Sequence, residues 1–117
     1  MRTELFSRLA LSTSGGTLNA SEVSQAVSMA GANSCQLEVV VYSISGTSPS
    51  IAFQLQESND LENWADKPPT PTAATTAGYK AMAAQTAVSA AYVRLKATIT
   101  GSAAVAVLAA GLNTAAL

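Results

Sequence analysis

The feature that most constrains the fold of this sequence is a period-two alternation of apolar side chains. It runs through the segment 36–44 and again through the segment 50–57. Residues of a β-strand point alternately to opposite faces, so this period predicts two strands and no helix. The expected inward side chains are Leu37, Val39 and Val41 in the first segment and Ile51, Phe53 and Leu55 in the second. The opposite face of the first strand carries Val40, Tyr42 and Ile44, which indicates a central strand or a face in an interface.

A second pair of apolar runs, 92–99 and 103–112, follows the same plan. Gly101 lies between these two runs, as Gly46 lies between the first two. Such turn residues between alternating runs predict β-hairpins. We therefore expect two long hairpins, Leu37–Glu57 and Tyr92–Leu112, at the heart of two packed sheets. The expected inward side chains of the second hairpin's first strand are Val93, Leu95, Ala97 and Ile99.

Shorter strands are expected in the rest of the chain. Their predicted ranges are 3–12, 23–29, 62–65 and 79–84, with a short helix after Ser21 as the alternative to the second. A proline-rich loop is expected at 67–71, and an exposed strand or loop at 72–78.

About eight strands at this spacing predict an all-β fold, a single-domain antiparallel β-sandwich over residues 1–117, jelly-roll-like in type. Residues 1–11 form either the first strand or an N-terminal arm. As an arm they would reach a neighbouring subunit through Leu5, Phe6 and Leu9.

Charged residues make up only 11% of the chain, against about 25% in an ordinary globular domain. With 49% hydrophobic residues, this predicts a surface that partners cover in part. The net charge of −1 offers no basic stripe for nucleic acid. No apolar run approaches the length of a membrane helix, and no signal-peptide core follows Glu4, so we expect neither a membrane nor a nucleic-acid partner.

The residues needed for common enzyme chemistry are missing. The chain has no histidine, which removes the commonest general base and zinc ligand. Its one cysteine, Cys35, has no histidine to activate it and is expected to be a buried small apolar residue. We therefore predict no catalytic residue, no cofactor and no metal, hence a protein that is not an enzyme.

Two local groups allow a functional and a structural interpretation. The carboxylates Glu57, Asp60, Glu62 and Asp66 could bind Ca²⁺, but they lack the regular spacing of a calcium loop. A solvated turn, in which Asn59 and Asp60 cap their own backbone, is favoured.

The second such group is aromatic. Trp64, together with Tyr42, Tyr79 and Tyr92, could form a platform for stacking sugars. The favoured interpretation places Trp64 at one end of the core, with its N–H donated to a loop carbonyl. The candidate core residues are Trp64, Phe53, Leu55, Val93 and Leu95.

Three stretches, residues 45–50, 53–60 with Trp64, and 91–96, resemble small β-sandwich proteins of tailed phages and prophages. Those proteins occur among virion structural genes and include capsid decoration, or cement, proteins. The element Ser58-Asn59-Asp60 with Trp64 is also similar to a hairpin of discoidin-like jelly rolls. The resemblance covers roughly residues 23–113.

The resemblance implies a protein made in the host cytoplasm that binds on the virion, between major capsid protein subunits at the capsid surface. It would also associate with itself as a homotrimer or another symmetric oligomer. Two alternatives remain open: a carbohydrate-binding jelly-roll module, and a tail or head-fibre component. The candidate interface residues are Leu5, Phe6, Leu9, Val40, Tyr42 and Ile44.

Overall fold

The computed structural model describes residues 2–14, 18–67, 73–81 and 86–116. These residues form an all-β structure, and no helix occurs among them. The strands are β1 (Arg2–Ser12), β2 (Ser21–Val23), β3 (Val27–Ser28), β4 (Ser34–Ser58), β5 (Ala65–Lys67), β6 (Gly78–Ala81), β7 (Thr86–Ala87) and β8 (Tyr92–Ala115).

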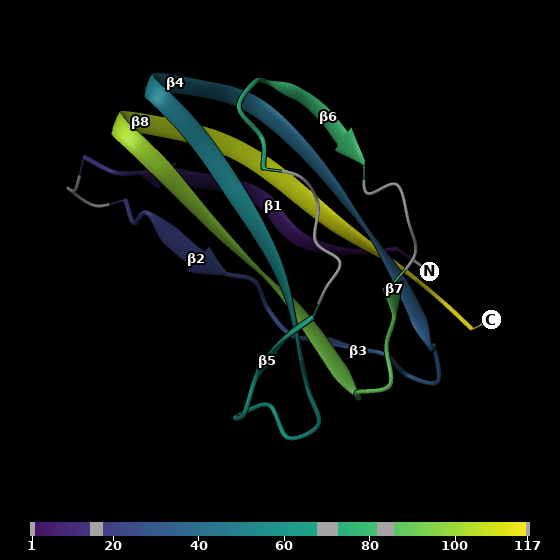
Figure 1. Cartoon of the computed structure of the whole chain (residues 1–117). Helices are drawn as coiled ribbons and strands as arrows, with labels where there is room; N and C mark the ends of the chain where they lie inside the picture. Colours follow the sequence, from purple (N-terminus) through teal and green to yellow (C-terminus); the bar gives the residue numbers. More distant parts are fainter. Residues whose placement is uncertain (1, 15–17, 68–72, 82–85, 117) are drawn as a thin grey trace.

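Two very long strands, β4 and β8, organise the molecule. They pair antiparallel along their whole length, from Ser34 opposite Ala115 to Ser58 opposite Tyr92. Together they make one two-stranded ribbon, which bends back sharply over itself near its middle (Figure 1). The bend divides the ribbon into two layers that face each other.

The short strands widen each layer. In the first layer, β1 pairs with the C-terminal half of β8, while β6 and β7 pair with the N-terminal half of β4. In the second layer, β2 and β3 pair with the N-terminal half of β8, and β5 with the C-terminal half of β4. The eight strands form an antiparallel sheet folded into a sandwich, which confirms the predicted fold class.

The predicted hairpins, however, are wrong in their pairing. Leu37 pairs with Leu112 rather than with the end of its own segment, and Glu57 pairs with Val93. The turns near Gly46 and Gly101 therefore fold each strand from one layer to the other. Alternation and turn residues predict where a chain reverses. They do not say whether the two arms then meet through backbone hydrogen bonds or through side chains.

Glycine is required where the two bends cross. Gly46 has φ +119°, and a Cβ built on it would lie 2.6 Å from the Cα of Ala104. Gly101 has φ +124°, and its Cβ would lie 3.0 Å from the carbonyl oxygens of Thr47 and Ser48. Both the left-handed backbone and the close approach exclude a side chain at these positions.

The core lies between the layers and is built from cross-strand pairs of β4 and β8. Leu37 packs beside Leu112 in one layer, and Leu55 beside Leu95 in the other. Burial of one such leucine side chain stabilises the fold by about 1.5–3 kcal/mol. Of the candidate core residues, Phe53, Leu55, Val93 and Leu95 are all at most 3% exposed.

The short strands differ from the prediction in detail. The segment 23–29 is interrupted, because the Ser24 hydroxyl accepts a hydrogen bond from the Leu95 N–H at 2.9 Å. The backbone N–H of Ser24 donates to the Leu95 carbonyl. This exchange leaves β2 and β3 as two pieces, and no helix follows Ser21. The edge strand expected at 62–65 lies later, as β5.

The remaining segments agree with the prediction in part. Of the two alternatives for residues 1–11, the structure has the strand, since β1 pairs with β8. Of the segment 72–78, the described residues 73–77 form a loop with a bridge between Ala74 and Ile51, and Gly78 begins β6. Most of the proline-rich loop and the end of the strand predicted at 79–84 lie outside the described residues.

Candidate interaction surface

The first layer presents apolar side chains to solvent on its outer side. Tyr42 is 53% exposed, Tyr79 61% and Val105 36%. Smaller or half-buried apolar residues of β4 and β8 lie between them. We call this surface the apolar outer face; its residues are Val40, Tyr42, Tyr79, Val105, Val107 and Ala109.

Strand register places these side chains together. Val40 is directly opposite Tyr79 on β6 and Ala109 on β8, and directly paired residues of an antiparallel sheet share a face. Tyr42 is the extra residue of a β-bulge, because Val41 pairs with Leu108 and Ser43 with the next residue, Val107. Tyr42 keeps the outward direction that alternation from Val40 gives it, and its ring is exposed.

The same bulge changes the face on which one predicted interface residue, Ile44, lies. Without it, Ile44 would share a face with Val40 and Tyr42. The bulge shifts the alternation by one residue, so Ile44 pairs with the buried Ala106 and packs against the core. A period-two pattern cannot reveal such an insertion, because a bulge changes the parity without any fixed sequence signal.

The three predicted interface residues of β1 turn toward the core within a single copy of the chain. Leu5 is only 6% exposed and belongs to the core, while Phe6 and Leu9 pack against it half-buried. Pairing of β1 with β8 turns these side chains toward the chain's own interior. Only Val40 and Tyr42 of the predicted set lie on the apolar outer face. Sequence reasoning missed Tyr79 and Val105, because the partners of β6 and of the bend were unknown.

The outer side of the second layer is polar by contrast. The Arg94 Nε donates to Gln56 Oε1 at 2.8 Å, and Gln56 Nε2 donates to Asp66 Oδ1 at 3.1 Å. Lys96 and Thr98 continue this side along β8. Val23, which pairs with Lys96, is 44% exposed on this side, whereas the exposed rings of Tyr42 and Tyr79 lie on the first. The two outer sides of the sandwich thus differ in chemistry, and the first is the more apolar.

Trp64 is not in the core, contrary to the favoured prediction. Its side chain is half-buried, and its Nε1 donates to the Leu61 carbonyl at 3.3 Å, so the loop-carbonyl contact does occur. The Arg94 guanidinium lies 4.1 Å from the ring centroid, a cation–π contact that covers one face of the indole.

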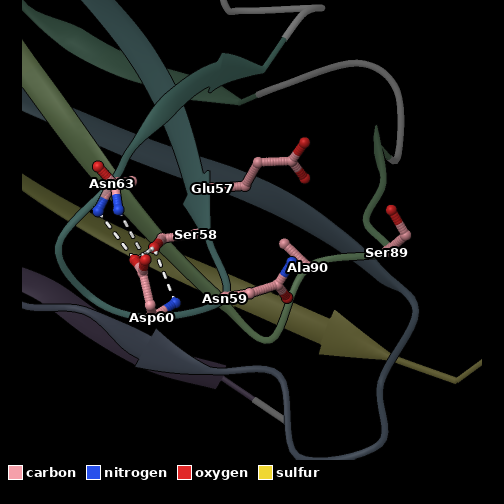
Figure 2. Close-up of a pocket in the computed structure, with 7 residues that line it drawn as sticks. All are labelled: Glu57, Ser58, Asn59, Asp60, Asn63, Ser89 and Ala90. Atoms are coloured by element: carbon pink, nitrogen blue, oxygen red, sulfur yellow. Dashed lines mark hydrogen bonds between the residues drawn. The ribbon is translucent and has the colours of Figure 1, made fainter.

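The acidic segment forms a self-contained turn. The Asp60 carboxylate accepts hydrogen bonds from the Asn63 N–H at 2.8 Å, the Asn63 side-chain amide at 2.7 Å and the Ser58 hydroxyl at 2.9 Å (Figure 2). It also accepts from the Glu62 N–H at 2.9 Å. These bonds, led by the Asn63 N–H, hold the pKa of Asp60 well below its usual range. The predicted turn is confirmed for Asp60. Asn59 differs, because its side-chain oxygen accepts from the Ala91 N–H instead.

A hollow of about 290 Å³ lies beside this turn. In Figure 2 the Glu57 carboxylate points away from Asp60, toward the segment of Ser89. Glu57 is paired with Lys67 Nζ at 3.7 Å. Because the oxygens of Asp60 are already used by its own loop, they are not free to converge on a cation with Glu57. Within the described part of the chain, no group of three or more potential metal-ligating side chains is found.

Cys35 is 1% exposed, between the two layers. Burial raises the pKa of its thiol to about 11, an effect that Lys67 reduces and Glu57 reinforces. A neutral, covered thiol is a poor nucleophile. Cys35 therefore acts in packing.

The chain matches no known protein-family model and no curated protein. Among the residues described, none forms a helix that is long and apolar enough to cross a membrane. The function is therefore inferred from the surface itself.

Proposed function

We propose that this chain is a non-enzymatic structural protein of a virion, which decorates the capsid by binding between major capsid protein subunits. The observation that carries the proposal is the apolar outer face. A sandwich with one polar and one apolar outer side is suited to a place in an assembly, where the apolar side is covered.

The composition supports the same proposal. Only 11% of the residues are charged, so the chain has few groups to keep an isolated monomer dispersed. The hydroxyl, amide and alanine side chains on the rest of the surface tolerate contact with a neighbouring protein, because little charge has to be desolvated.

The test is binding to expanded capsids assembled from the major capsid protein of the same genome. We expect saturable binding, with extra density at regular lattice positions in images of the particles. Density confined to the tail or to fibres would instead assign the chain to those parts. Absence from every particle, together with a monomeric mass, would contradict the proposal.

The carbohydrate-binding alternative has one observation in its favour, the half-exposed ring of Trp64. Against it, Arg94 already covers one face of that ring. Because Trp64 lies outside the core, Trp64→Ala is expected to leave the fold intact. If the parent chain binds glycans and this substitution abolishes the binding, the alternative is favoured. If neither chain binds glycans, the alternative is excluded.

A further inference from the structure

We propose that the apolar outer face pairs with the same face of a second copy of this chain, so that two sandwiches pack face to face about a two-fold axis. The inference rests on the proposed function in one respect only, that this face is covered in the working assembly. Residue sizes on the face and a cation–aromatic contact favour a second copy as the partner, and the dimensions of the molecule allow it.

The dimensions of the molecule allow an interface of standard size. The molecule measures 42 × 28 × 22 Å, and the smallest of these dimensions suits the thickness of two packed layers. The broad side is therefore at most 42 × 28 Å. A standard interface needs about 800 Å² from each partner, which lies within this limit.

The shape of the face is complementary to itself. Its strand order is β6-β4-β8-β1, so β4 and β8 are central. β4 presents the larger side chains Val40 and Tyr42, while β8 presents Ala109 beside Val40. A two-fold axis along the strands, midway between β4 and β8, places β4 of one copy over β8 of the other. Val40 of each copy then lies over Ala109 of the second copy, larger over smaller.

One charge at the border of the face favours this pairing. Arg8 on β1 already lies 5.5 Å from the ring centroid of Tyr42. Tyr79 on β6 lies at the opposite border, and the same axis carries it toward Arg8 of the second copy, where a cation meets an aromatic ring. Glu38 accepts a hydrogen bond from the Asn113 amide, and the axis places it over Gly111 of the second copy. The exposed Glu4 is the β1 partner of Gly111, so a like charge opposes the pairing at this one position.

The experiment measures the mass of the full chain in solution by light scattering across a concentration series. We expect twice the 11.8 kDa of one chain. Ala109→Arg places a long cation at the small residue of β8 over which Val40 of the second copy would lie. This variant is expected to yield the single-chain mass. The matched control is Ala52→Arg, an exposed alanine on the polar side of β4, which is expected to keep the double mass.

Circular dichroism melting separates loss of pairing from loss of folding. If Ala109→Arg does not fold, Tyr42→Lys at a 53%-exposed position replaces it, with the same expected fall to the single-chain mass. A monomeric parent chain would overturn the inference, and so would a trimer or an equal effect of the Ala52 control. Capsid binding by a monomeric parent would leave the proposed function standing without the inference. A dimer that does not bind capsids would support the inference and contradict the proposed function.

Discussion

At the scale of single residues, polar side chains of this protein act largely on its own backbone. The Ser24 hydroxyl accepts the Leu95 N–H in place of a backbone carbonyl, and the Asp60 carboxylate accepts the N–H groups of its own turn. The Asp60 turn was predictable because all its partners lie within three residues. The partner of Ser24 is 71 residues away, and no local pattern identifies it.

Asp60→Asn is expected to reduce the loss of unfolding free energy that the parent protein shows as the pH falls into the acid range. The folded-state pKa of Asp60 is lowered, so its contribution is present above the ordinary carboxyl pKa of about 3.9 and is lost as the pH falls below that value. Urea unfolding of both proteins at several pH values between 7 and 2 measures the difference. The control is Asp66→Asn, whose carboxylate accepts from Gln56 alone among the bonds described. Parallel curves for the parent and Asp60→Asn would contradict the expectation.

At the scale of elements, irregularities decide what the strands present. The bulge at Tyr42 returns Ile44 to the core, and the bends at Gly46 and Gly101 convert two expected hairpins into one folded ribbon. Ile44 aside, the inward faces of β4 and β8 were predicted correctly on both sides of the bulge. Strand partners were not, because alternation is a property of one strand at a time.

Gly46→Ala is expected to lower the free energy of unfolding by about 2 kcal/mol or more, because it combines a strained φ with a Cβ 2.6 Å from the Ala104 backbone. Gly31→Ala is the matched control. Gly31 has φ +88°, but nothing lies within 4 Å of its added Cβ, so strain alone, about 1 kcal/mol, is expected. Chemical denaturation measures both. Equal losses would show that the crossing of the bends tolerates a methyl group.

At the scale of the whole molecule, β4 and β8 run through both layers, so neither layer is a separate folding unit. Removing a core side chain from one layer weakens the ribbon that the other layer also uses. Most of the pairing between β4 and β8 joins residues far apart in sequence. Such topologies fold slowly, because long loops must close before the pairing stabilises them.

Leu108→Ala in the first layer and Leu95→Ala in the second are each expected to lower the free energy of unfolding by about 2–5 kcal/mol. Both side chains are fully buried. Each substitution is expected to accelerate amide hydrogen exchange in both layers and to leave a single unfolding transition. Val23→Ala, at a 44%-exposed position, is the control with an expected change below about 0.5 kcal/mol. Faster exchange in the substituted layer alone would contradict a shared ribbon.

By itself, the sequence determined the strand character of the chain, the inward faces of its two longest segments, the turn at Asp60 and the scarcity of charge. These are local properties, set by the two-residue period of extended backbone and by side chains within a few residues of each other. Only the tertiary structure decided that 34–58 and 92–115 pair with each other, that Trp64 lies outside the core, and that Tyr79 joins Tyr42 on one outer side. Those outcomes depend on which backbone groups find each other across the fold, and a period along one strand carries no information about its neighbour.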